Sequence, residues 1–222
     1  MKKYTLIFIL STILSSCSSE PCSHTTDIVD VTNPITGRTW MDRNLGASRV
    51  AKSSKDALAF GDLYQWGRRA DGHQCRNSAN TTNISSTDQP PHVKFILNGY
   101  GFEDWRNPQN PNLWQGLNGV NNPCPSGYRL PTEAEWKDEI ASWGSKNASG
   151  AFASPLRLPM AGNRLDRNGT LNNIGTHDFW LGFYWSSTVN GTDSRYLAFH
   201  SNKAYFHDNG RANGFSVRCI KD

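Results

Sequence analysis

Residues 129–136 read Arg-Leu-Pro-Thr-Glu-Ala-Glu-Trp, and this stretch constrains the fold more than any other. Thr132 precedes a run of good helix formers, and Glu135 follows it by three residues, which is the spacing of a capping box. Ile140 and Trp143 then follow the tryptophan of this stretch by four and seven residues, as on one face of a helix. The sequence therefore predicts a capped helix that begins after Thr132 and buries an aromatic face.

Beyond Ser154, strand-like runs alternate with turn residues. Turns are predicted at residues 166–169 (DRNG), 190–191 (NG) and 209–210 (NG), because Asn-Gly favours the positive φ angles of tight hairpins. Residues 215–219 alternate apolar and polar side chains, as in a strand with one buried face. We therefore predict an antiparallel β meander at the C-terminal end.

The N-terminal half holds further predicted elements. Residues 28–31 and 38–41 indicate two strands joined by a turn. Ser54 is a suitable N-cap for a helix that extends to about Trp66, although Gly61 costs such a helix about 1 kcal/mol. The predicted class is α+β, with two helices in the N-terminal half, long irregular loops and the C-terminal meander.

The long irregular loops are predicted over residues 70–125, which are rich in Asn, Ser, Gly and Pro. A structureless loop of that length is unusual in a compact domain, and disordered segments are poor in aromatic residues. We therefore expect ordered loops that Trp105 and Trp114 pin to the body, with Cys75 as a further staple.

The N-terminus has the pattern of an export signal. Lys2 and Lys3 precede an apolar run at residues 6–14, which as a helix would rise only about 14 Å, under half of the ~30 Å hydrocarbon core. This length indicates a signal peptide and not a membrane-spanning helix.

The apolar run ends in LSSC at residues 14–17, which resembles a bacterial lipobox. The resemblance implies that residues 1–16 are removed and that the thiol of Cys17 is diacylated, which would anchor the protein firmly in a membrane. Ser18 after the lipid-bearing cysteine implies the outer membrane, and residues 17–27 are predicted to form a polar tether. The alternative is an ordinary signal peptide with an incidental cysteine.

Composition excludes several classes of protein. With 36% hydrophobic and 19% charged residues, the 222-residue chain is not a coiled coil, a collagen or a charge-rich disordered chain. Two charges of the formal +4 are Lys2 and Lys3, so the domain itself is nearly neutral. No basic stripe remains, and nucleic acid is not a predicted partner.

Four cysteines follow Cys17, namely Cys22, Cys75, Cys124 and Cys219. An even number in an exported protein suggests disulfides, and four cysteines allow three pairings. No C-x-x-C spacing occurs, so a zinc site is not predicted.

Several stretches together resemble one bacterial family. CPSGYRLPT at 124–132, YWSST at 184–188 and GFSVRC at 214–219 resemble the Fibrobacter succinogenes major paralogous domain. MDRNL at 41–45 and GDLYQW at 61–66 resemble the N-terminal part of that domain. The family is found in exported bacterial proteins and lipoproteins, and it has no established biochemical activity.

This resemblance covers residues 28–222 and implies a single domain. The RLPTEAEW stretch is also similar to the formylglycine-generating, sulfatase-modifying enzymes, which implies a C-type-lectin-like fold. The terminal cysteine of the family's Gly-Phe-x-x-x-Cys motif implies a disulfide between Cys124 and Cys219, which would leave Cys22 and Cys75 as a second pair.

Catalysis is not predicted. The formylglycine-generating enzymes hold copper with a cysteine pair before the C-terminal Gly-Phe motif, whereas residues 181–212 contain no cysteine. The chain also lacks G-x-S-x-G, H-E-x-x-H and P-loop motifs, and it lacks the calcium-ligand motifs of the calcium-dependent lectins. No catalytic residue, metal or other cofactor is therefore predicted. Polar clusters at residues 71–75 and 200–208 are alternatives for a metal site, but loop histidines are mostly solvated.

Tryptophan supplies the candidate binding residues. Trp105, Trp114 and Trp180 lie in loops rich in Gly and Asn, and indole rings can stack on the faces of sugars. The alternative is that each packs its loop onto the body. We predict a lipid-anchored envelope protein whose loops at 70–125 bind glycan or protein. A structural envelope component without a soluble ligand is one alternative, and a divergent sulfatase-modifying-type enzyme is another.

Overall fold

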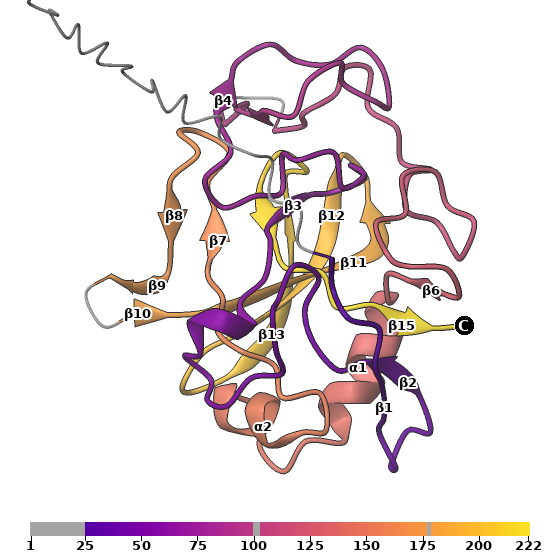
Figure 1. Ribbon diagram of the computed structural model, residues 1–222, viewed down its shortest axis with the longest axis vertical. Coiled ribbons are helices and arrows are strands. Elements are labelled where there is room, and N and C mark those ends of the chain that lie inside the picture. The colour runs from indigo at the N-terminus through magenta and orange to yellow at the C-terminus, as the bar shows by residue number, and fades with distance from the viewer. Residues whose placement is uncertain (1–24, 100–102, 177–178) are drawn as a thin grey trace, which may run out of the picture.

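The computed structural model describes residues 25–99, 103–176 and 179–222, and its central feature is an antiparallel sheet (Figure 1). Strands β11 (Gly182–Asn190), β12 (Asp193–Phe199) and β13 (Ala204–Asn209) follow one another in this sheet, in chain order. The predicted C-terminal meander is confirmed in these three strands. The strand predicted over residues 215–219 is wrong, because β14 ends at Phe215 and the apolar and polar side chains that follow are all buried. Within the described ranges, no helix is long and apolar enough to cross a membrane.

A second sheet brings the two ends of the domain together. Its strand order is β1 (Asp30–Thr32), β2 (Thr39–Met41), β15 (Ile220–Lys221) and β6 (Tyr128–Arg129), all antiparallel. The predicted pair of N-terminal strands is confirmed. Because β2 pairs with β15, the first and last parts of the domain lie side by side.

A third sheet connects the middle of the chain with the C-terminal motif. It contains β3 (Tyr64–Gln65), β14 (Gly214–Phe215), β7 (Asn163–Arg164) and β8 (Leu171–Asn172), in that order.

The remaining described strands form two small pairs. Strands β4 (Asn80–Thr81) and β5 (Phe95–Ile96) are parallel, whereas β9 (Ile174–Thr176) and β10 (Phe179–Trp180) are antiparallel.

The capped helix is confirmed as α1 (Glu133–Ala141). The Thr132 hydroxyl accepts a hydrogen bond from the backbone N–H of Glu135 at 3.2 Å, and the Glu135 carboxylate accepts from the backbone N–H of Thr132 at 2.8 Å. Trp136 and Ile140 are buried, as the spacing predicted. The capping box thus sets where α1 begins, and the aromatic face of α1 packs the helix against the sheet.

The predicted helix between Ser54 and Trp66 is wrong. Only a 3-10 turn at Ala57–Ala59 forms there, followed by strand β3. Gly61 adopts φ +66°, which lies in the left-handed region, so a right-handed helix does not continue through it. The backbone N–H groups of Asp62 and Leu63 donate to the carbonyls of Leu45 and Gln74, and not to carbonyls four residues earlier as in a helix.

The second helix is instead α2 (Ala148–Ala153), which the sequence pattern did not predict. The Asn147 side chain caps it by accepting from the backbone N–H groups of Ser149 and Gly150. Both helices therefore lie in the second half of the chain and not in the first. The α+β class itself is confirmed.

Arg218 organises a buried polar network between distant parts of the chain. Its guanidinium donates to the Asn44 side-chain oxygen at 2.9 Å and to the Leu156 carbonyl at 2.7 Å. Asn44 in turn donates to the Tyr184 hydroxyl at 3.2 Å, and that hydroxyl donates to the Pro159 carbonyl at 2.8 Å. Asn44, Tyr184 and Arg218 come from three of the motifs that carry the family resemblance. They bind one another inside the core, so these residues stabilise the fold.

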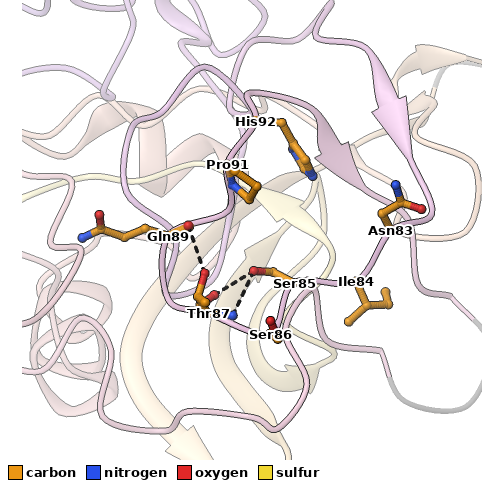
Figure 2. Close-up of a pocket in the computed structure, with 8 residues that line it drawn as sticks. All are labelled: Asn83, Ile84, Ser85, Ser86, Thr87, Gln89, Pro91 and His92. Atoms are coloured by element: carbon orange, nitrogen blue, oxygen red, sulfur yellow. Dashed lines mark hydrogen bonds between the residues drawn. The ribbon is translucent and has the colours of Figure 1, made fainter.

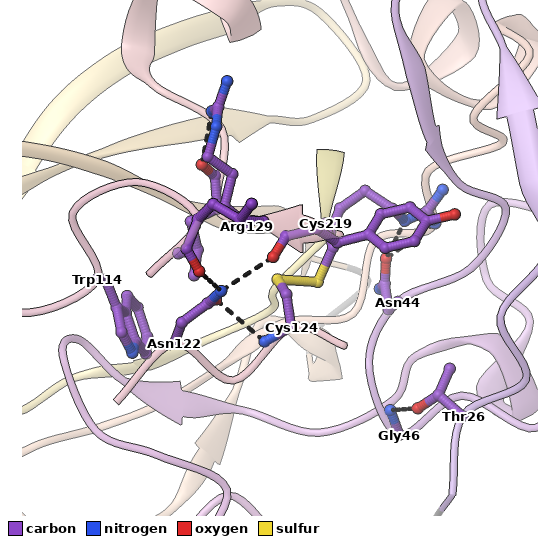
Figure 3. The surroundings of a disulfide bond; sticks show 12 residues. Thr26, Asn44, Gly46, Trp114, Asn122, Cys124, Arg129 and Cys219 are labelled. Carbon is purple, nitrogen blue, oxygen red and sulfur yellow. Dashed lines mark hydrogen bonds between the residues drawn. A yellow bond between two sulfur atoms is a disulfide. The ribbon is translucent and has the colours of Figure 1, made fainter. Parts of the chain in front are cut away.

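The Cys124–Cys219 disulfide is present and joins positions 95 apart in the sequence (Figure 3). Asn122 lies beside it, where its side-chain oxygen accepts from the backbone N–H of Cys124 at 3.1 Å. Cys75 is disulfide-bonded as well. Cys22, its expected partner, lies outside the described residues, so that pairing stays a prediction. The same holds for the lipidation of Cys17.

Candidate functional site

The loops at residues 70–99 lie at the end of the molecule opposite α2, and the described loops from residue 103 onward lead from there toward β6 (Figure 1). The loops at 70–99 are built around the parallel pair of β4 and β5, whose register joins Asn80 to Phe95 and Thr81 to Ile96. Residues 82–94 therefore form a loop that leaves and returns at adjacent points.

Two of the predicted binding tryptophans are not available for stacking. Trp105 is 1% exposed and donates its indole N–H to the Trp66 carbonyl at 2.7 Å. Trp114 is 0% exposed and donates to the Asn121 carbonyl at 2.8 Å. Both pin their loops to the body, as the alternative interpretation held, and their assignment as binding residues is wrong. Trp180 lies in β10, and its side chain is outside the described part of the molecule.

The 82–94 loop itself forms an open groove of about 440 Å³ (Figure 2). That volume lies within the range of about 300–1,000 Å³ typical of small-molecule sites. The groove is lined by eight residues from two stretches of the loop, Asn83, Ile84, Ser85, Ser86, Thr87, Gln89, Pro91 and His92. Figure 2 shows Pro91 and His92 on one side, facing the stretch that begins at Asn83.

Hydrogen bonds within the loop set the shape of the groove. The Ser85 hydroxyl donates to the Thr87 carbonyl at 2.8 Å and accepts from the Thr87 backbone N–H at 3.2 Å. The Thr87 hydroxyl then donates to the Gln89 carbonyl at 3.0 Å. Two of the hydroxyls in the groove therefore serve mainly to hold the turn, as Ser and Thr side chains do in loops.

The groove is also fixed to the body from behind. The Arg68 guanidinium, which is fully buried, donates to the His92 carbonyl at 2.9 Å and to the Lys94 carbonyl at 2.8 Å. On the other wall, Ser85 donates its backbone N–H to the Trp105 carbonyl at 3.0 Å. A third attachment joins Asp88 to Arg106 at 2.7 Å. Because both walls are held, the groove exists before any ligand arrives.

The lining side chains carry no formal charge at neutral pH. None of them is Asp, Glu, Lys or Arg, and burial together with the nearby Arg68 guanidinium lowers the pKa of His92. Asp88 is close by but is neutralised by Arg106. The groove can thus donate and accept hydrogen bonds, and its lining contains no carboxylate, thiol or ion pair.

The polar cluster at 71–75 is built into the fold. His73 is fully buried, with Nδ1 2.8 Å from an Asp71 oxygen, and its Nε2 accepts from the Gln65 backbone N–H at 3.1 Å. Burial lowers the pKa of His73 to about 4. Both ring nitrogens are engaged, and Cys75 is disulfide-bonded. In the part of the chain that the structure describes, no group of three or more His, Cys, Asp or Glu is arranged to hold a metal.

One buried acidic residue, Asp104, lies within the loops. Asp104 is 2% exposed, and burial raises its pKa to about 6. The Arg211 guanidinium lies 3.7 Å from it and packs over the Trp66 ring at 4.7 Å. This pair joins the loop segment that contains Asp104 to Arg211, which lies just before β14.

The groove lies within the segment predicted to form long loops, but the sequence did not predict the groove itself. Residues 83–92 read NISSTDQPPH, and such a cluster of Asn, Ser, Thr and Pro is a turn signal without further specificity. The feature of the sequence that could have indicated the groove is the group of small polar residues next to Pro90 and Pro91. The two walls are brought together by Arg68 and Trp105, which are distant in sequence.

Searches of family models, of curated proteins and of solved structures found nothing that matches this chain.

Proposed function

We propose that the protein is an exported lipoprotein of the cell envelope, and that its domain at residues 28–222 is a non-catalytic binding module. The observation that carries this proposal is the preformed groove at 83–92, held by Arg68 and Trp105 at an exposed end of the molecule. A site whose walls are fixed in advance loses little conformational entropy on binding, so it suits recognition.

The leader supports the proposed location. Residues 1–16 have the composition of a signal peptide, and LSSC ends in a cysteine suited to acylation. Disulfides persist in oxidising compartments, and both Cys75 and the Cys124–Cys219 pair are in the oxidised form. We propose the outer membrane as the site of attachment, because Ser18 follows the lipid-bearing residue.

The proposed family is the Fibrobacter succinogenes major paralogous domain, with a C-type-lectin-like fold. Three observations support it: the paired first and last strands, the long loops at one end, and the network that Arg218 makes with Asn44 and Tyr184. The absence of catalysis is likewise a proposal. It is supported by the disulfide bonds of Cys75, Cys124 and Cys219, which leave these sulfurs unable to act as thiolates.

The experiment expresses the full chain with its leader and labels the cells with radioactive palmitate. Wild type should incorporate label and sediment with outer membranes, whereas Cys17→Ala should do neither. The full chain, purified in detergent, is then tested for binding to polysaccharides and to envelope proteins. A protein that bound neither, in repeated preparations with intact disulfides, would contradict the binding-module proposal.

A structural role in the envelope is the second candidate. It is favoured by two adjacent exposed apolar side chains next to the tether, Ile28 at 57% and Val29 at 45% exposure. Exposed apolar surface often marks contacts between proteins. A binding module should be monomeric once its lipid is removed, whereas an assembly component should associate through this surface, and sedimentation of residues 18–222 distinguishes the two.

A further inference from the structure

We propose that the groove at residues 83–92 binds a neutral sugar chain, held by side-chain hydrogen bonds from Asn83, Ser86 and Gln89. This inference rests on the proposed function, since it names the ligand class of the same site.

The charge of the lining selects the class of ligand. All eight lining residues are uncharged at neutral pH. Two charged side chains adjoin them: Asp88 is paired with Arg106, and Arg69 donates to the Gln89 side-chain oxygen at 3.0 Å. An anionic polymer or a phosphate placed in the groove would find no cation in the lining to compensate the water it loses, and a cation would find no anion there. A ligand with many polar groups and no charge avoids this cost.

Hydrogen-bonding groups remain available on the three side chains. Among the described residues, the side chains of Asn83 and Ser86 make no hydrogen bond, and both are exposed. Gln89 is exposed too, and its side-chain oxygen accepts from Arg69 at 3.0 Å, so its NH₂ group is the part of this side chain that a ligand can use. Amides and hydroxyls both donate and accept, as sugar hydroxyls do, so each can satisfy a vicinal pair of hydroxyls.

Apolar surface makes up the larger part of the groove lining. Ile84 is 37% exposed and Pro91 is exposed as well, and the two lie in the two stretches that line the groove (Figure 2). Such surface suits the C–H faces of a pyranose. A peptide would require a deep pocket for a side-chain anchor or an open strand edge, and the lining provides no such pocket.

The test uses the full chain in detergent micelles, with binding measured by interferometry. The probes are soluble neutral glucans, mannans, galactans and xylans, with polygalacturonate and heparin as anionic polymers and a random peptide library as a third class. Asn83→Ala and Gln89→Ala are compared with Asn202→Ala, an exposed amide in the turn between β12 and β13. All three side chains are exposed, so the variants should fold, and matching thermal unfolding verifies this.

We expect at least one neutral glycan to bind, and Asn83→Ala and Gln89→Ala each to weaken its Kd about three- to tenfold, as loss of one hydrogen bond does. Asn202→Ala should bind as wild type does. Binding of a glycan that both groove variants leave unchanged would overturn the inference while the binding-module function stands. Selective binding of the anionic polymers or of peptides would also overturn the inference of a neutral sugar and leave the binding-module function standing. If no probe and no envelope protein bound, both the neutral-sugar inference and the binding-module function would be contradicted.

Discussion

Two buried groups should give this domain opposing responses to acid. His73 is fully buried, and its pKa falls from 6.5 to about 4, first through burial and then through the charge of Arg68. Between these values the unfolded chain binds a proton that the folded protein refuses. Stability is therefore full above pH 6.5 and is lost as the pH falls toward 4, by about 3 kcal/mol at 1.36 kcal/mol for each pKa unit.

Asp104 acts in the other direction. Burial raises its pKa from 3.8 to about 6, so the folded protein binds a proton that the unfolded chain refuses in this window. Stability from this group is therefore gained as the pH falls from 6 to 3.8, again by about 3 kcal/mol. The two contributions nearly cancel in wild type, and each becomes visible only when the other is removed.

The assay is denaturant unfolding of residues 18–222 with disulfides intact, at pH 7.5 and pH 4. His73→Gln keeps an acceptor for the Gln65 N–H and should become more stable at pH 4 relative to pH 7.5, by about 3 kcal/mol compared with wild type. Asp104→Asn should lose about 2 kcal/mol over the same interval compared with wild type. His207→Gln, at an exposed position, is the control. Profiles for His73→Gln that run parallel to wild type would refute the reasoning.

Three further predictions concern stability, each measured by denaturant unfolding. Replacing Cys124 and Cys219 by Ala should cost about 4–5 kcal/mol, because the disulfide closes a loop of 95 residues; a loss below about 1 kcal/mol would contradict this. Thr132→Ala should cost about 1 kcal/mol by removing the cap of α1, whereas Thr132→Ser should retain most of it. Gly61→Ala should cost at least about 1–3 kcal/mol, since φ is +66° and the Leu45 carbonyl blocks the new Cβ; an unchanged midpoint would show that this turn rearranges freely.

The accuracy of the sequence predictions followed how local their causes are. Helix α1 was predictable because its cap and its apolar face lie within one short stretch of chain. The helix predicted to end at Trp66 failed because contacts with the distant Leu45 decide the conformation of Gly61.

The candidate site shows the same division. An indole in a polar loop can either stack on a ligand or anchor the loop, and only burial distinguishes the two, as it did for Trp105 and Trp114. The groove has two walls from different stretches, and Arg68 positions one of them through backbone carbonyls, an interaction that leaves no trace in the loop's own sequence. Composition could indicate the region but not the shape.

The parallel bridge between β4 and β5 has a consequence for how such a protein can diversify. Because Asn80 pairs with Phe95 and Thr81 with Ile96, the two ends of the 82–94 loop are already closed by the scaffold. Doubling the length of a closed loop costs only about 0.6 kcal/mol of entropy. The segment between these strands can therefore be exchanged as a cassette: related copies could keep one frame and carry different specificities, in the way that variable loops do on a constant sandwich.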